Sequence, residues 1–150
     1  MSSHGKEIAI ALGKLLRRDV RQRIYVSLTD GVGEGVNEST YPVLSGLERC
    51  GSATAAELSA VLGLDRSVVS RHATTLEEAG LLNRAPDERD RRWTALTLTD
   101  AGKRAVEVMR ERLHESIDDF LSEWPDDQVS VFTTILTAFT TNGPIADRTP

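Results

Sequence analysis

Residues 64–82 read LDRSVVSRHATTLEEAGLL, and this stretch decides the fold because its spacing predicts a helix with two different faces. Asp65 is expected to cap the first turn with its carboxylate, and Gly80 is expected to end the helix. The apolar face has members three or four residues apart: Val69, His72, Ala73 and Leu76. The polar face holds short hydroxyl groups and a guanidinium: Ser67, Ser70, Arg71 and Thr74.

The polar face suits a nucleic-acid groove. Small hydroxyl side chains let a helix approach DNA closely, and an arginine such as Arg71 can bind guanine through two parallel hydrogen bonds. Val68 adds an apolar surface that suits the methyl group of thymine. An ordinary amphipathic helix, whose polar face only meets water, explains these residues equally well, so the neighbouring segments have to separate the two interpretations.

A short helix just before this stretch favours the DNA-binding interpretation. Thr54 and Glu57 have the spacing of a capping box, and the helix that they open is expected to close at Gly63. Its inward residues are expected to be Leu58, Val61 and Leu62. Only Gly63 and Leu64 lie between this helix and the next cap, and so tight a junction is typical of a helix-turn-helix.

A β-hairpin is predicted after Gly80. The segments LLNRA and WTALTLT flank the charged run PDERDRR at residues 86–92, which indicates two antiparallel strands and a wing loop. Arginines at a hairpin tip can enter a narrow minor groove, and either Asp87 or Asp90 could hold one arginine by an ion pair while another points outward. The arginines of this region are Arg84, Arg89, Arg91 and Arg92. A solvated polar turn is the alternative.

Amphipathic helices are predicted on both sides of this winged unit. One continuous helix is expected over residues 6–28, and a second from Ser39 or Thr40 to Arg49 with Pro42 in its first turn. A long helix is expected from Thr99 to Trp124, followed by a last helix and a fraying tail over residues 143–150. The last helix is expected to turn five residues inward: Val129, Phe132, Ile135, Leu136 and Phe139.

The outer helices need a surface to bury their apolar faces. Pairing of two chains would supply it, and a two-fold dimer would place two recognition helices about 34 Å apart, or a multiple of that, on a palindromic DNA site.

Composition sets further bounds. The chain has 150 residues and a net charge of −5, but residues 54–104 hold eight basic and eight acidic side chains, so the excess of acid lies outside the winged unit. The lone Cys50 excludes a disulfide within the chain, and its expected role is packing. The apolar runs are too short for a membrane span, and the charged N-terminus does not suit a signal peptide, so a cytoplasmic protein is expected.

Catalytic and metal-binding patterns are not found. The three histidines, His4, His72 and His114, are scattered, and none belongs to a nucleophile motif, a metal-ligand spacing or a glycine-rich phosphate loop. We therefore expect no enzyme activity, no metal and no cofactor.

The motifs together resemble the multiple antibiotic resistance regulator (MarR) family. LDRSVVSRHATTLEEAGLLNR, PDERDRR and LTLTDAGK are similar to its recognition helix, its wing motif and the opening of its long dimer helix. The resemblance covers nearly all of the chain. It implies a mainly α winged helix-turn-helix fold with a small β-hairpin wing, in a single domain over residues 1–150. The implied parts are dimerisation helices within 6–36 and 100–142, a winged lobe at 39–99 and a flexible tail at 143–150.

The implied function is a homodimeric, ligand-responsive repressor that binds a palindromic operator. By position, the major-groove residues would be Ser67, Val68, Ser70 and Arg71. The DNA backbone would be contacted by Arg66 and Thr74, and the wing contacts would come from Arg89, Arg91 and Arg92. Asp87 matches the family's buttressing carboxylate, and Asp90 is expected to support the wing as well. A winged helix that binds a protein in place of specific DNA is the alternative.

The resemblance also implies an effector site between the dimer helices and the winged lobe. Arg18, Tyr41 and His114 are candidates to bind a small aromatic effector, although core packing for Tyr41 and solvation for His114 are simpler explanations. His72 stands where the family usually has an aliphatic residue, which leaves a pH effect open. Oxidant sensing is the alternative role for Cys50.

Overall fold

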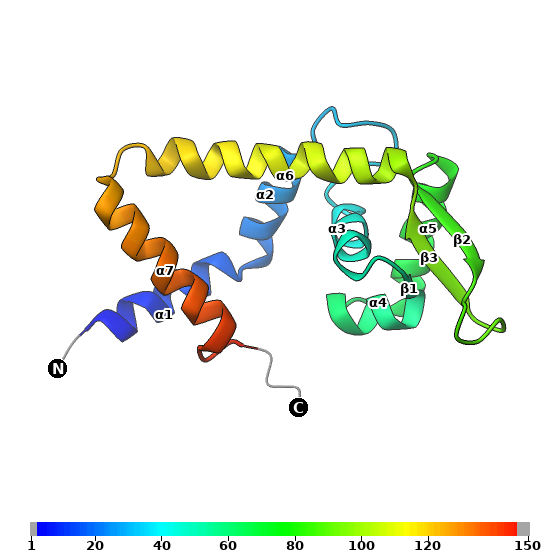
Figure 1. The fold of residues 1–150 in the computed structure, drawn as a ribbon, viewed down its shortest axis with the longest axis horizontal. Helices are drawn as coiled ribbons and strands as arrows, with labels where there is room; N and C mark the ends of the chain where they lie inside the picture. The colour runs from blue at the N-terminus through cyan, green and yellow to red at the C-terminus, as the bar shows by residue number, and fades with distance from the viewer. Residues whose placement is uncertain (1–2, 147–150) are drawn as a thin grey trace. The chain divides into compact units, whose positions relative to one another are not determined.

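The computed structural model describes residues 3–146, which form seven helices and three short strands (Figure 1). In chain order they are α1 His4–Leu15, α2 Arg18–Thr29, α3 Tyr41–Cys50, β1 Ala53–Thr54, α4 Ala55–Leu62, α5 Arg66–Glu78, β2 Leu82–Pro86, β3 Thr94–Leu98, α6 Asp100–Leu121 and α7 Asp126–Asn142. The chain divides into two compact units, Met1–Arg112 and Leu113–Pro150. Among residues 3–146, no helix is both long and apolar enough to cross a membrane.

The first unit contains the predicted helix-turn-helix. The capping box of α4 is confirmed, since Glu57 N–H donates to Thr54 Oγ1 (3.2 Å) and Thr54 N–H donates to Glu57 Oε2 (2.9 Å). Gly63 ends α4 in the left-handed region at φ +64°, and α5 begins three residues later. The two helices share a core with α3, and its fully buried side chains include Leu44, Leu58, Val69 and Leu76.

Two details of this region differ from expectation. Val61 is 63% exposed, because Leu58 and Leu62 are the side chains of α4 that pack on Gly46 of α3. Asp65 occupies the N-cap position of α5 with extended backbone, but its side chain makes no capping hydrogen bond. The turn holds instead through the backbone, with Val69 N–H donating to Asp65 C=O at 3.0 Å.

The predicted hairpin is confirmed and has a third strand. The sheet is antiparallel with the order β1-β3-β2; Ala53 and Thr54 pair with Leu96 and Ala95, and β2 pairs with β3 from Leu82 to Pro86. The strand β1 has only two residues, which is too short to give a periodic signal. Because β1 runs directly into α4, the central strand β3 ties the base of the wing to the start of the helix-turn-helix.

The start of α6 is locked to the end of the recognition helix. Thr99 Oγ1 accepts from Gly102 N–H (3.1 Å) and donates to Gly80 C=O (2.7 Å), while Thr99 N–H donates to Leu81 C=O (3.1 Å). A Cβ at Gly102 would overlap the Leu81 carbonyl oxygen, so this close approach requires glycine. Further along α6, the Arg112 guanidinium donates to Leu28 C=O at 3.0 Å.

The prediction of one continuous helix over residues 6–28 is wrong. Arg17 is extended (φ −62°, ψ 138°) and separates α1 from α2. Its guanidinium forms two hydrogen bonds with the Asp19 carboxylate, at 3.0 and 2.9 Å. Side chains two residues apart do not face each other on a helix, so this ion pair fits the break and not a continuous helix.

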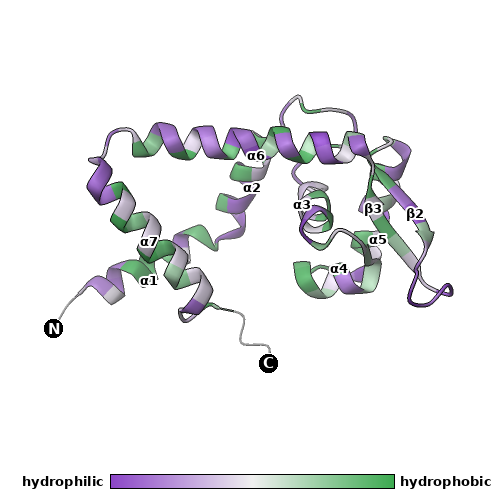
Figure 2. Ribbon diagram, viewed as in Figure 1, coloured by the Kyte–Doolittle hydropathy of each residue, from purple (hydrophilic) through white to green (hydrophobic). Residues whose placement is uncertain are grey.

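The second unit contains the end of α6 and all of α7. The expected inward turn of α7 is wrong for the single chain, because none of its residues is buried and Phe132, Ile135 and Leu136 are 53%, 61% and 46% exposed. Figure 2 shows hydrophobic residues along the length of α7. Residues 143–146 follow this helix, and the rest of the expected fraying tail lies outside the described residues.

Candidate nucleic-acid interface

The outer face of α5 is the first part of the site. Arg66, Ser67 and Arg71 are exposed, and Val68 and Ser70 are half-buried beside them. Within residues 3–146, neither Arg66 nor Arg71 has an ion-pair partner. Hydroxyl groups and two guanidiniums without carboxylate partners on one exposed helix face can bind phosphates and the edges of bases.

The position of α5 is fixed from the wing side by Arg84 of β2. Its guanidinium donates to Ser70 C=O and Thr74 Oγ1, both at 3.1 Å, and forms an ion pair with Glu77 Oε1 at 3.0 Å. Thr74, an expected backbone contact, therefore already uses its hydroxyl group within the protein. Arg84 therefore holds α5 in place. The local sequence around Arg84 does not indicate these partners.

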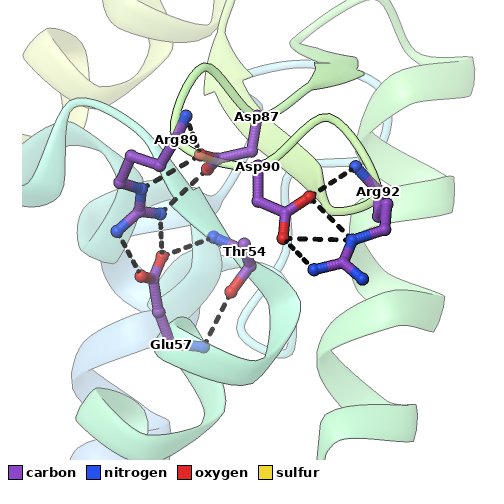
Figure 3. A network of polar contacts seen from close by, with 6 residues as sticks. All are labelled: Thr54, Glu57, Asp87, Arg89, Asp90 and Arg92. Carbon is purple, nitrogen blue, oxygen red and sulfur yellow. Dashed lines mark hydrogen bonds and ion pairs between the residues drawn. The ribbon is translucent and has the colours of Figure 1, made fainter.

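The wing loop contains an arginine held between two carboxylates (Figure 3). Asp87 is 3% exposed and accepts from the Arg89 backbone N–H (2.8 Å), Nε (3.0 Å) and Nη2 (2.8 Å). On its other side the same guanidinium donates to Glu57 Oε1 (2.7 Å) and Oε2 (3.0 Å). The sequence predicted the cap formed by Glu57 but not this second role, because the partner is 32 residues away.

These contacts change the acidity of both carboxyl groups. Hydrogen bonds from the Arg89 side chain and then from the Arg89 backbone lower the pKa of Asp87 to about 2. The Arg89 side chain and then the Thr54 backbone N–H lower the pKa of Glu57 to about 2. Both groups are therefore ionised across the physiological range, and the pKa of Arg89 is raised in return.

At the tip of the wing, Arg91 has no ion-pair partner in the described residues, whereas Arg89 and Arg92 are paired with aspartates. Asp90 accepts from the backbone N–H (3.0 Å) and Nη2 (2.7 Å) of Arg92, and this hydrogen-bonded pair lowers the pKa of Asp90. Asp87 and Asp90 thus each form an ion pair with an arginine. The sequence had indicated only that one of the two aspartates could do so. Arg91 is exposed and has no ion-pair partner in the described part of the chain.

A cleft of about 620 Å³ lies between α5 and the wing. Arg66, Arg84 and Arg92 line it, together with Ser70 and the first residues of α4. Trp93, for which the sequence gives no functional signal, also lines the cleft and is 51% exposed. The walls of this cleft are rich in arginine although the whole chain is acidic.

The candidate effector residues lie in different surroundings. Arg18 lines a second cleft of about 410 Å³, together with Tyr25, Pro42, Val68 and His72. Tyr41 does not line this cleft but packs on the ring of Tyr25, with 4.5 Å between the ring centroids. His114 is exposed, in the part of α6 that belongs to the second unit.

His72 and Cys50 complete the predicted residues. His72 is half-buried, and burial, followed by the nearby charge of Arg71, lowers its pKa. The expectation that Cys50 packs in the core is wrong, because it is exposed at the end of α3. In the described residues, no group of three or more histidine, cysteine or acidic side chains is placed to hold a metal ion.

Helix-turn-helix, hairpin wing and third strand define a winged helix-turn-helix protein. A family model described as "MarR family" matches residues 34–92. Over these residues the chain is similar to the MarR family of winged-helix regulators, and the winged helix-turn-helix fold expected from the sequence is confirmed.

Relatives of this chain are named as regulators of transcription and not as enzymes. An uncharacterized HTH-type transcriptional regulator of Bacillus subtilis (strain 168), YxaD, is 28% identical over 117 residues, which is 78% of this chain and 82% of the relative. A MarR transcriptional regulator from Methanosarcina mazei Go1 has a similar structure, with a TM-score of 0.70 and 25% identity over 92% of this chain and 96% of its own. Apo MarR from E. coli shares the fold with a TM-score of 0.70 at 19% identity, over 91% of this chain and 96% of its own.

Proposed function

We propose that the chain is a sequence-specific DNA-binding regulator that works as a homodimeric repressor on a palindromic operator. The observation that carries this proposal is the exposed face of α5, where Ser67 and Arg71 lie open beside Arg66 without an ion-pair partner in the described chain. Ser67, Val68, Ser70 and Arg71 would enter the major groove, and Arg66 would contact phosphates. Thr74 would contact a phosphate only after its hydroxyl group releases the Ser70 carbonyl, to which it donates at 3.1 Å. Arg89, Arg91 and Arg92 would supply contacts from the wing.

Dimer formation is supported by the apolar side chains of α1 and α7, which are not buried within the single chain. No residue of α1 or α7 is buried, although both helices carry large apolar side chains. The exposed ones include Ile8, Ile10, Phe132, Ile135 and Leu136. We infer that helices within residues 6–36 and 100–142 pair between two chains, and that the lobe at 39–99 binds DNA. A protein with this function would act in the cytoplasm.

Effector binding is supported by the cleft beside α2. Its lining combines Arg18 and Tyr25, which suit an anionic aromatic molecule, with Val68 and His72 of the recognition helix. A ligand seated there would touch α5 directly and so could change DNA binding. Titration of a phenolic carboxylate should release DNA from the wild-type protein and require higher concentrations with Arg18→Ala.

The experiment that tests the function is selection of duplexes from a random pool, followed by affinity measurements against salt. An enriched palindrome is expected, and Arg71→Ala should weaken binding by about 1–3 kcal/mol and relax one base position. Arg91→Ala should weaken all duplexes alike and lower the salt slope by about one. Arg49→Ala, which removes an exposed arginine outside α5 and the wing, is the control. A pool without enrichment would favour a winged helix that binds a protein partner.

A further inference from the structure

We propose that the loop at residues 30–40 positions the recognition helix α5 by packing Gly35 against Ala79 at the end of that helix. This loop, which joins α2 to α3 in Figure 1, is called the brace below. Its effect on DNA binding rests on the function proposed above, whereas its effect on α5 can be tested without DNA.

The brace approaches the last turn of α5 through its backbone. A Cβ at Gly35 would lie 2.9 Å from Ala79 Cβ and 3.5 Å from the Thr75 carbonyl oxygen, so a larger residue fits only if the loop or the helix moves. Gly35 also has a φ of +77°, a conformation that favours glycine. The contact therefore requires glycine at this position for two independent reasons.

Buried hydrogen bonds hold Gly35 in place from within the brace. Thr40 is 2% exposed, and its Oγ1 donates to Gly35 C=O at 2.6 Å and accepts from Asn37 N–H at 3.1 Å. Asn37 Oδ1 in turn accepts from the backbone N–H groups of Ser39 (2.9 Å) and Thr40 (3.1 Å). Moving Gly35 away from α5 would break the Thr40 hydrogen bond and leave a buried hydroxyl group unsatisfied, which costs free energy. The brace therefore resists displacement.

The start of the brace is fixed to α6. The Arg112 guanidinium donates through Nη1 to Leu28 C=O (3.0 Å) and to Asp30 C=O (2.6 Å), where α2 ends and the brace begins. Just before α6, the Thr99 hydroxyl group donates to Gly80 C=O at 2.7 Å, directly after α5. The end of the recognition helix is therefore held by two parts of the chain, and both are attached to α6.

The position of this end matters because the groups proposed to read DNA lie nearer the other end of α5. Arg71 is eight residues before Ala79, which is about 12 Å along a helix. A tilt of about 10° at the braced end moves a group at that distance by about 2 Å, which is enough to break a hydrogen bond to a base edge. Phosphate contacts, which supply non-specific binding, depend less on such geometry. The brace should therefore act mainly on specific binding.

The first test compares Gly35→Ala with Gly31→Ala. Both glycines belong to the brace and have a positive φ, +77° and +65°, but a Cβ at Gly31 would meet nothing within 4 Å. The two variants share the backbone strain and differ in the contact with α5. Gly35→Ala should weaken binding to the selected duplex about tenfold, as expected when one base contact is misplaced, and should bind a scrambled duplex as the wild type does. Gly31→Ala should bind both duplexes as the wild type does.

The double variant Gly35→Ala, Ala79→Gly moves the methyl group from one side of the contact to the other. It should recover most of the affinity that Gly35→Ala loses. Ala79→Gly alone opens a gap and should weaken specific binding less than Gly35→Ala does. Equal affinities of Gly35→Ala and Gly31→Ala, or a double variant as weak as Gly35→Ala, overturn the proposal. An equal loss on the selected and the scrambled duplex also overturns it, because that pattern indicates loss of folded protein.

Hydrogen exchange without DNA tests the brace independently of the proposed function. Thr40→Val removes the hydroxyl group that holds Gly35 and keeps the shape of the side chain, whereas Thr40→Ser keeps the hydroxyl group. Amides of residues 76–80 should exchange faster, relative to those of α4, in Gly35→Ala and Thr40→Val but not in Gly31→Ala or Thr40→Ser. Exchange that rises equally in α4 and α5, or in neither, would refute the brace even if the protein binds DNA. Faster exchange at the end of α5 in a protein that enriches no duplex would support the brace and reject the proposed function.

Discussion

Replacing Gly102 by alanine should destabilise the protein, because the start of α6 passes very close to the end of the recognition helix. A Cβ at this position would overlap the Leu81 carbonyl oxygen and lie 3.1 Å from its carbonyl carbon and 3.3 Å from Leu98 Cδ2. The carbonyl cannot withdraw freely, since it accepts the Thr99 N–H at 3.1 Å. Backbone must therefore move, and not only the end of a flexible side chain.

The size of the effect follows from three contributions. Forcing extra volume into a packed site costs about 1–3 kcal/mol, and losing the Thr99 hydrogen bond costs about 1 kcal/mol. Alanine offsets up to about 1 kcal/mol of this loss of stability, because it loses less backbone entropy on folding into a helix than glycine does. We expect Gly102→Ala to lower the free energy of unfolding by about 1–3 kcal/mol.

Urea unfolding at constant protein concentration would measure this, with two other helical glycines as controls. Gly13 has nothing within 4 Å of its would-be Cβ, so Gly13→Ala should be neutral or stabilising by up to about 1 kcal/mol. Gly46 faces Leu62 Cδ2 at 3.2 Å and Leu58 Cδ2 at 3.3 Å, which are ends of side chains that can shift. Gly46→Ala should stay within about 1 kcal/mol of the wild type. If Gly102→Ala is as stable as the wild type, or if Gly46→Ala is the most damaging of the three, the reasoning from backbone contact is wrong.

Three further outcomes follow from burial and charge. Leu58→Ala removes a side chain with 0% exposure between α3 and α4, and urea unfolding should show a loss of about 2–5 kcal/mol. The lowered pKa of Glu57, about 2 against 4.5 ordinarily, means that its contribution to stability is complete above pH 4.5 and is lost as the pH falls toward 2. Unfolding midpoints between pH 6 and 3 should therefore fall more steeply for the wild type than for Glu57→Gln, and parallel curves would contradict this. The exposed Cys50 should react with a thiol reagent in the native protein, and protection until unfolding would show that it is covered.

The helix-turn-helix was predictable because its signals are local. The capping box, Gly63 and the spacing of Val69, Ala73 and Leu76 lie within about two dozen residues, and each agrees with the same fold. The break at Arg17 was not predictable from periodicity, because no glycine or proline marks it and its ion pair with Asp19 fits only after the chain has turned.

The site was harder to predict because its geometry depends on distant partners. The sequence showed that acidic residues in the wing could hold arginines, but not which arginine each one holds. Glu57 shows the reason most clearly, since its local pattern explains a helix cap and gives no indication of Arg89 in the wing. Likewise, the apolar spacing in α7 indicated burial, but burial within one chain and burial against another produce the same pattern.

The exposed apolar residues of α7 also bear on the order in which the chain leaves the ribosome. Residues up to Arg112 form a compact unit with its own buried core, and they are synthesised before α7. At about 5–20 residues per second, the winged lobe has a few seconds in which to fold before that apolar helix is complete. The exposed apolar side chains of α7 are thus completed only after the winged lobe has had time to fold.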